Sequence, residues 1–253
     1  MGTHHRRSIA AAVMVQRSPG PRYVGQHSGW YITQEQVRVQ GVTRSGYSVS
    51  RGGGRLMSDI YHDGQRRLQD RFDTRRLADR LDERIVHDRI TDSDRRVIER
   101  LDMFFLATAD AEGRPNCSYK GGDRGFVRVL DEHNLVFPSW DGNGMYLSAG
   151  NLLTNPQVGM LFIDFERQNR LRLNGVASID ERDPLLGDYP GAQLVVRVRV
   201  REVFPNCPRY IHKLQRVEAS AYVPRPGCTP PVPDWKRSDL ARDVLPANDP
   251  ARD

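Results

Sequence analysis

The fold is decided by the stretch from Phe104 to Phe165, which reads FFLATADAEGRPNCSYKGGDRGFVRVLDEHNLVFPSWDGNGMYLSAGNLLTNPQVGMLFIDF. Within it, short runs of β-branched and aromatic residues alternate with clusters of turn residues, which is typical of consecutive strands. The turn at 110–113 ends in Gly113, where a left-handed residue is needed, and predicts a hairpin between strands at 104–109 and 114–119. A second hairpin is predicted for strands at 126–130 and 135–138, joined by residues 131–134.

The second half of the region predicts a crossover followed by three longer strands. A Gly- and Asn-rich loop at 139–144 leads into a short helix at 145–154, which Asn155-Pro156 is expected to end. The later strands are predicted at 158–163, 170–179 and 193–203. The first of these is a continuous apolar run suited to burial on both faces, and the other two alternate apolar and polar residues. Six or seven strands with one helical crossover predict a small antiparallel barrel.

Charged helices are expected ahead of the barrel. Leu77, Leu81 and Ile85 recur at four-residue spacing, with Thr74 as a candidate N-cap. A second helix start is predicted at Thr91, where Thr-Asp-Ser-Asp precedes an apolar pattern. We interpret this region as a solvated flank packed on the barrel.

The positive charge of the chain is concentrated at its N-terminus. Residues 1–56 contain eight Arg and one acidic residue, Glu35, so they carry about +7, against a formal net charge of +6 for the whole chain. The remainder is therefore close to neutral, and no basic face for nucleic acid is predicted on the folded domain. We expect residues 1–56 to be a disordered basic leader, and the change of composition at Met57 suggests a misplaced start codon upstream.

Several other function classes lack support in the sequence. Cys117, Cys207 and Cys228 are far apart without a CxxC spacing, which fits a reducing, cytoplasmic compartment and gives no metal signature. No apolar run approaches the roughly 18 residues that a membrane span requires, and the run at 9–15 is too short for a signal peptide. No GxSxG, HExxH or P-loop pattern is present, so the catalytic residues are unknown.

The series of motifs between residues 94 and 203 resembles the flavin-nucleotide-binding proteins related to pyridoxamine 5'-phosphate oxidase. The resemblance implies a mainly β fold with helical flanks, a split antiparallel β-barrel of the FMN-binding type. It also implies a homodimer with FMN in two clefts at the subunit interface. Arg128-Val129-Leu130 is the nearest match to the family's Arg-x-Val-Leu strand, which lines the flavin.

Two cations are candidates for the phosphate of such a cofactor. Arg128 shares strand parity with apolar residues, and a charge on that face is costly unless it is paired with an anion. Lys120, just before Gly121-Gly122, could add a second cation. The alternative for Arg128 is a surface salt bridge with Asp131 or Glu132.

The loop at 139–144 supplies the remaining candidates. It precedes a helix, where free backbone N–H groups and the positive end of the dipole attract phosphate. Asn143, Gly144 and Met145 are expected at that contact, while Phe137 and Trp140 could pack near the ring; the alternative is an ordinary Gly-rich turn with Trp140 in the core. The predicted cofactor-binding residues are Lys120, Arg128, Val129, Leu130, Phe137, Ser139, Trp140, Asn143, Gly144 and Met145.

The chain also departs from the oxidase that gives the family its name. Tyr146-Leu147-Ser148 stands where the oxidase has a Ser-Arg-Lys run, and the oxidase's C-terminal signature for the vitamin B6 phosphate is unmatched. We therefore do not expect pyridoxamine 5'-phosphate oxidation. The expected function is an FMN-binding oxidoreductase-like protein that transfers hydride or electrons between a reduced nicotinamide nucleotide or small organic substrate and an acceptor.

Two alternatives remain open from the sequence. The same barrel could hold deazaflavin F420 or haem, or the protein could be a non-catalytic flavin store or interaction module. The expected domain division is a leader at 1–56, a helical flank at 57–102, the barrel at 103–217 and a Pro-rich tail at 218–253. A turn and helix are possible at 205–217.

Overall fold

The computed structural model describes residues 60–252, all of which belong to one unit of the chain, residues 54–253. The predicted leader at 1–56 lies outside the described residues. The helices and strands are, in chain order, α1 Asp63–Arg71, α2 Arg75–Ile85, α3 Asp92–Arg100, β1 Met103–Ala109, β2 Pro115–Gly121, β3 Arg128–Val129, β4 Asn134–Trp140, α4 Leu147–Thr154, β5 Gln157–Asp164, β6 Asn169–Asp180 and β7 Ala192–Asn206. Short 3₁₀ helices follow at η1, Leu186–Asp188, and η2, Asp234–Arg237.

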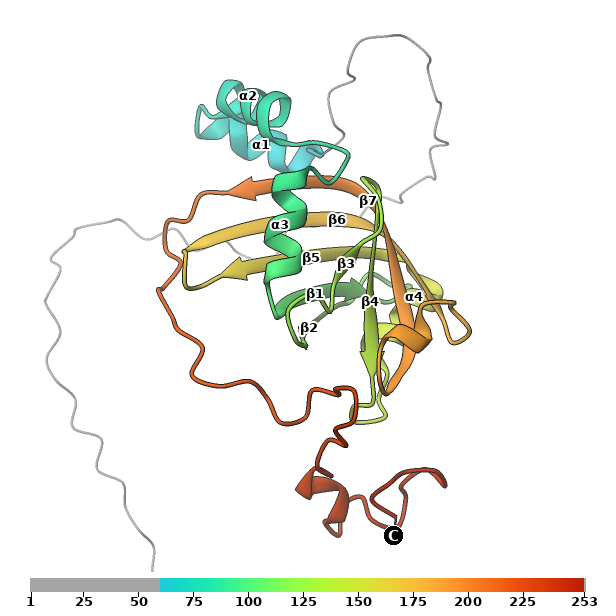
Figure 1. The fold of residues 1–253 in the computed structure, drawn as a ribbon. Helices are drawn as coiled ribbons and strands as arrows, with labels where there is room; N and C mark the ends of the chain where they lie inside the picture. Colours follow the sequence, from blue (N-terminus) through green and yellow to red (C-terminus); the bar gives the residue numbers. More distant parts are fainter. Residues whose placement is uncertain (1–59, 253) are drawn as a thin grey trace, which may run out of the picture. The chain divides into compact units, whose positions relative to one another are not determined.

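The seven strands form one antiparallel sheet in the order β2-β1-β5-β6-β7-β4-β3 (Figure 1). Both predicted hairpins are confirmed, since β1 pairs with β2 and β3 pairs with β4. Gly113 has a φ of +81°, as the first turn requires. The second hairpin is shorter than predicted, because β3 keeps only two residues in register. The seven antiparallel strands with flanking helices confirm the predicted fold class.

The core is built around Phe104, which is fully buried at the start of β1. Its ring lies 5.0 Å from the ring of Phe137, 5.2 Å from that of Phe162 and 5.9 Å from that of Phe126. These aromatic rings come from strands β1, β4 and β5 and from the loop before β3. This aromatic cluster therefore packs β1, next to one edge of the sheet, against β4, next to the other edge.

The long strands alternate as the sequence predicts. In β6, Leu171, Leu173 and Ala177 are buried while Arg172 is exposed. In β7 the register with β6 shifts next to Gly175, where an added Cβ would lie 2.4 Å from the carbonyl oxygen of Arg199. The expectation that β5 is buried on both faces is wrong, because its buried residues alternate with half-buried ones. The second face of this strand is only partly covered.

Helix α3 is anchored to the sheet at both ends. Thr91 forms a capping box with Asp94, which confirms the predicted helix start. Arg95 donates to the carbonyl oxygen of Val129 at 2.6 Å, and Arg100 pairs with Asp164 at 2.7 Å. These contacts tie α3 to β3 and to the end of β5, and Figure 1 shows the helix crossing in front of the sheet.

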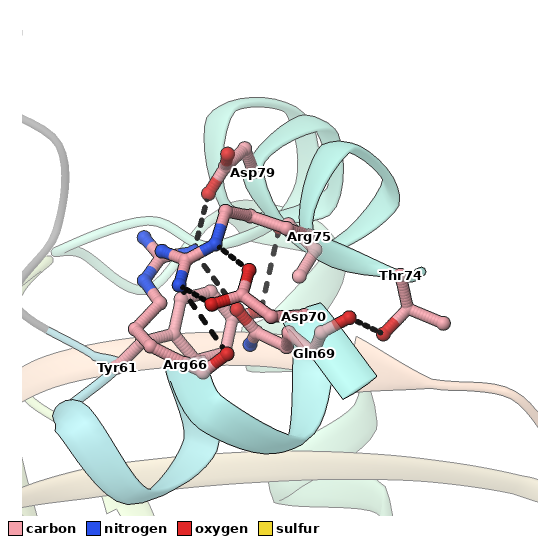
Figure 2. Close-up of polar contacts among 8 residues, drawn as sticks. Tyr61, Arg66, Gln69, Asp70, Thr74, Arg75 and Asp79 are labelled. Carbon is pink, nitrogen blue, oxygen red and sulfur yellow. Dashed lines mark hydrogen bonds and ion pairs between the residues drawn. The ribbon is translucent and has the colours of Figure 1, made fainter. Parts of the chain in front are cut away.

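Helices α1 and α2 are joined mainly by polar contacts (Figure 2). Arg66 donates to Asp79 at 2.5 Å and its guanidinium lies 4.7 Å from the ring of Tyr61, while Arg75 forms a bidentate pair with Asp70. No residue of α1 is buried.

The leucine spacing in α2 correctly predicts the helix but not its buried face. Leu77 is 58% exposed and Leu81 is 41% exposed, and Thr74 makes no side-chain cap hydrogen bond. Ala78 and Asp82 are the buried residues of this helix instead. The expected packing of the leucine face on the barrel is therefore wrong.

The last strand extends slightly beyond its predicted end at residue 203. Strand β7 runs through Asn206, and residues 207–217 form no helix. The chain then continues as an irregular arm to residue 252, in which Lys236, Ala241 and Leu245 are buried. None of the helices within residues 60–252 has the length and apolar character needed to cross a bilayer.

Candidate functional site

A cavity of about 310 Å³ opens where β2, the end of β4 and the start of α4 meet. Its walls carry polar side chains from β2, the glycine-bearing loop after β4, and the first turn of the helix. The lining residues include Asn116, Ser118, Lys120, Ser139, Trp140, Asn143, Gly144 and Ser148. Five of them, Lys120, Ser139, Trp140, Asn143 and Gly144, are among the residues predicted for cofactor binding.

Lys120 is the cation of this smaller cavity. Its side chain is half-buried, and burial lowers the pKa of its ammonium group because the charged form loses hydration. Within residues 60–252 the ammonium group makes no hydrogen bond and no ion pair, whereas the backbone of Lys120 pairs with β1. A half-buried cation without a counter-ion gains by binding an anion from solution.

The start of α4 faces the same cavity without a cap. Tyr146 occupies the N-cap position in the left-handed region, at φ 49°, and its side chain makes no capping hydrogen bond. Its hydroxyl group is bonded to Gln193 instead, at 2.9 Å. The first N–H groups of a helix have no partner inside the helix, so they are available to an anion.

The loop before α4 is shaped by Asn143 and Gly144. The Asn143 Oδ1 accepts a hydrogen bond from the Met145 N–H at 3.1 Å, and Gly144 has a φ of +75°. A residue with a side chain is disfavoured at that φ, so glycine is needed there. The Met145 N–H, which was predicted to contact phosphate, already donates to Asn143.

The cavity floor holds a small hydroxyl and amide network. Asn116 Nδ2 donates to Ser148 Oγ at 3.2 Å, and the hydroxyl oxygens of Ser118 and Ser148 are 3.0 Å apart. Asn116, Ser118 and Lys120 point to one side of β2 because alternate residues of a strand share a face. The sequence reasoning missed this network, although the period of two in Asn-Cys-Ser-Tyr-Lys could have predicted it.

Trp140 lies at the junction of two cavities. Its indole N–H donates to the carbonyl oxygen of Pro190 at 2.9 Å, and its ring stacks on Phe126 at 6.2 Å. The pairing of β4 with β7 shifts between Ser139 and Trp140, a bulge that re-aims side chains at the strand end. Ser139 and Trp140 thus belong to strand β4, whereas the sequence placed both residues in the loop at 139–144.

The second cavity is larger, at about 1060 Å³, and shares Trp140 with the first. One wall comes from the barrel, including Met103, Tyr119 and Gly121, and the other from the arm at residues 214–224. The smaller cavity is polar and cationic, while the larger one offers the aromatic rings of Tyr119, Trp140 and Tyr222. A long ligand with an anionic end and a flat end could occupy both.

Arg128 does not join this site. Its guanidinium pairs with Asp188 at 2.7 Å and lies 4.3 Å from the ring of Tyr189, whose pKa is raised to about 12 by burial. Arg128 lines neither cavity. The expected convergence of Arg128 and the glycine loop is therefore not found. Arg128 forms a salt bridge, but the partners that the alternative named, Asp131 and Glu132, are wrong, because the partner is Asp188.

The other predicted residues on β3 and β4 also lie away from both cavities. Val129 is buried, and its N–H and carbonyl groups are bonded to Glu99 and Arg95 of α3. Phe137 is buried in the aromatic core against Phe104, and Leu130 is 41% exposed. The geometry therefore gives these residues structural contacts and no access to a ligand in either cavity. Within residues 60–252 no group of His, Cys, Asp and Glu side chains could hold a metal ion.

The part of the chain that forms the sheet is similar to a known protein family. Residues 90–207 match the family model described as pyridoxamine 5'-phosphate oxidase. No curated protein matches the chain. The matched residues run from the start of α3 to the end of β7, and they include every strand of the sheet and the whole lining of the smaller cavity.

Solved structures resemble the same part of the chain. They include an FMN-binding protein from Syntrophomonas wolfei, with 11% identity, a TM-score of 0.38, and coverage of 56% of this chain and 97% of that one. A structure described as an F420 reductase shares 21% identity at a TM-score of 0.33, covering 43% and 93%. HutZ, the heme storage protein from Vibrio cholerae, shares 25% identity at a TM-score of 0.33, covering 46% and 94%. Residues 90–207, just under half of this chain, are thus similar to the family described as pyridoxamine 5'-phosphate oxidase, and this part contains the whole sheet.

Proposed function

We propose that the protein binds FMN and acts as an oxidoreductase, transferring hydride or electrons between a reduced nicotinamide nucleotide or small organic substrate and an acceptor. The observation that carries the proposal is Lys120, an unpaired, half-buried cation that faces an uncapped helix start in a polar cavity. This pairing suits the dianionic phosphate of FMN, which needs positive charge and N–H donors together.

Different residues around the two cavities would bind different parts of the cofactor. Lys120, the loop at Asn143 and Gly144, and the first turn of α4 would hold the phosphate. Ser118 and Ser148 offer hydroxyl groups to the ribityl chain, and Trp140 borders the space for the ring. The flavin supplies the redox chemistry, so we assign no catalytic side chain, and the protein's part is to bind, orient and shield the cofactor.

Two other cofactors remain candidates because structures of similar fold are named for them. Deazaflavin F420 also carries phosphate, so Lys120 would suit it equally well. Haem is less favoured, because no histidine lines either cavity and histidine is the commonest axial ligand. A third possibility is a protein that stores flavin without catalysing a reaction.

We also propose that the protein is a homodimer, in a reducing compartment such as the cytoplasm. Large apolar side chains are exposed near both cavities: Leu147, at 54%, lines the smaller one, Met145, at 61%, is two residues before it, and Tyr119, at 60%, lines the larger one. A second copy that covers these side chains would remove apolar surface from water and enclose the cavities. Light scattering of the purified protein tests this, and a monomer at micromolar concentration would contradict it.

The test of cofactor binding compares FMN with riboflavin, which lacks the phosphate. We expect Lys120→Met to weaken FMN binding about 10- to 100-fold, because a hydrogen bond to a charged group contributes about 1.5–3 kcal/mol. Riboflavin binding should change little. Lys213→Met is the matched control, since Lys213 is exposed and lines neither cavity.

The result that would overturn the proposal is equally direct. Purified protein that stays colourless after incubation with FMN would exclude a flavin site. If FMN binds tightly but reduced nicotinamide nucleotides are oxidised no faster than by free flavin, the storage function is favoured. Visible absorption and mass of any released ligand separate FMN from F420 and haem.

A further inference from the structure

The arm at residues 207–252 lies outside the part of the chain that matches the family. Three of its cations each meet an aspartate of the barrel unit. Arg216 pairs with Asp102, Arg225 forms two hydrogen bonds of 2.7 Å with Asp123, and Lys236 lies 2.5 Å from Asp141.

The three aspartates mark out one end of the barrel. Asp102 directly precedes β1, Asp123 follows β2, and Asp141 follows β4. Asp102 and Asp141 line the larger cavity, and the arm residues between the first two ion pairs, 216–224, line its opposite wall. Figure 1 shows the arm leaving the end of β7 and running toward the lower end of β4. The ion pairs therefore lie along the edge that the arm closes.

Lys236 is the most buried member of this set. Its side chain is 5% exposed, and its ammonium group also lies 2.7 Å from Asp249, whose side chain is 6% exposed. Burial opposes the charge on Lys236, but hydrogen bonds to Asp141 and Asp249 outweigh it and raise its pKa. The contact with Asp141 joins the end of the arm to the loop after β4, and other residues of this loop line the smaller cavity.

The part of the arm that lines the larger cavity carries apolar and polar side chains. Its apolar lining residues are Leu214, Ala219, Ala221, Tyr222, Val223 and Pro224, and its polar ones are Gln215, Arg216, Glu218 and Ser220. The apolar side chains suit an organic molecule with an apolar ring or chain, and the polar ones can bond to polar groups that it carries. Because the larger cavity meets the smaller one at Trp140, whatever binds there would lie beside the cofactor.

We propose that residues 207–252 form the specificity-determining wall of the larger cavity, held on the barrel by the pairs to Asp102, Asp123 and Asp141. The arm decides which apolar organic substrate reaches the cofactor. The substrate part of this inference rests on the proposed flavin function, whereas the attachment of the arm does not. The two parts are therefore tested separately.

The attachment is tested by hydrogen exchange of the full chain without cofactor. We expect Arg225→Gln to raise exchange of residues 214–228 at least tenfold and Lys236→Met to do the same for residues 234–249, while strands β5 to β7 exchange as before. The matched control is Arg242→Gln, because Arg242 pairs only with Asp239 of the same arm and is 70% exposed. Unchanged exchange in both variants would overturn the inference, as would faster exchange across the whole barrel.

Exchanging the two charges tests whether the ion pair itself, and not a general disturbance of the arm, accounts for the faster exchange. Arg225→Asp alone should loosen the arm, and combining it with Asp123→Arg should restore slow exchange, since the pair is then re-formed with opposite polarity. A double variant as loose as the single variant would show that the contact between these two side chains does not hold the arm, and would overturn the inference.

Access to the cofactor is then tested on FMN-loaded protein with organic electron donors of increasing size. Opening the arm with Arg225→Gln should lower the discrimination in kcat/KM between small and bulky donors at least tenfold, mainly through KM. Arg242→Gln should leave it unchanged. If the arm loosens but the discrimination between donors stays the same, the proposal that the arm selects the substrate is refuted. If no FMN binds, the proposed function fails while the exchange result still stands.

Discussion

The two cavities that meet at Trp140 differ in how the charges around them are partnered. In the smaller one, built wholly from the part of the chain that matches the family, Lys120 has no partner among the described residues. Around the larger one, the cations that the arm brings to the barrel are paired with aspartates. Arg124 and Arg167 also line it without an ion pair among the described residues, but unlike Lys120 both are exposed. Paired charges fix the positions of chain segments, whereas an unpaired half-buried charge indicates where something else binds.

The same contrast separates the two cations that the sequence put forward. Arg128 and Lys120 both lie on strands and both can bind phosphate. The structure gives Arg128 a carboxylate and an aromatic ring, and it leaves Lys120 without a partner. The sign of the charge and the face of the strand on which it lies do not show whether a cation is paired within the protein or is left to bind a ligand.

The largest expected effect comes from the core that supports both cavities. Phe104→Ala should lower the free energy of unfolding by about 3–5 kcal/mol, because it removes a fully buried ring and leaves a cavity between three others. Urea denaturation measures the loss. Leu153→Ala is the control, since that side chain is 75% exposed and should change stability by less than about 0.5 kcal/mol. Similar losses in both variants would contradict the assignment of the core.

A direct comparison of the two cations should show the next largest effect. We expect Arg128→Met to change FMN affinity less than about twofold, against the 10- to 100-fold loss expected for Lys120→Met. Instead, Arg128→Met should lower the midpoint of thermal unfolding slightly, because it frees Asp188 and uncovers Tyr189. Equal losses of affinity in the two variants would mean that β3 contributes to the phosphate site after all.

The pH dependence of FMN binding should report on Lys120 itself. Burial lowers the pKa of free Lys120 below its ordinary value of 10.5, and a bound phosphate would raise it again. Affinity should therefore be constant between about pH 7, where the phosphate is dianionic because its second pKa is about 6, and the lowered pKa of Lys120, and it should fall by up to tenfold for each pH unit above that pKa.

Two controls isolate that titration. Riboflavin corrects for titration of the ring system, because it carries no phosphate. Lys120→Met should give the same profile for FMN as for riboflavin. A fall in FMN affinity that persists in Lys120→Met would assign the titration to another group.

The sequence predicts the sheet well because local signals agree with tertiary packing. Alternation in β6 and β7 and the turn glycine at Gly113 depend on nearest neighbours and strand pairing, and all three are confirmed. The leucine spacing in α2 shows the limit of this reasoning. A periodic apolar face predicts a helix, but it does not show whether a partner covers that face.

The candidate site could be predicted only in part for the same reason. Lys120 and the glycine loop were predicted because each carries a local signal, a cation directly before Gly121-Gly122 and a glycine-bearing loop directly before a helix. The bulge at Trp140, the burial of Phe137 and the pairing of Arg128 with Asp188 depend on contacts between distant segments. The ion pairs of the arm span more than 90 positions in sequence, so spacing carries no signal for them.

The smallest expected effect separates the exposed ion pairs of the arm from the buried one. Arg225 and Asp123 are 35% and 49% exposed, so salt should screen their attraction, whereas Lys236 and Asp249 are almost fully buried and should be screened much less. Raising the salt to about 1 M, where the screening length is about 3 Å, should speed hydrogen exchange of residues 214–228 several-fold and leave residues 234–249 nearly unchanged. Uniform acceleration would mean that the arm opens as one unit controlled by its exposed pairs. If neither segment changes, apolar contacts hold the arm and its ion pairs contribute little, as isolated surface pairs often do.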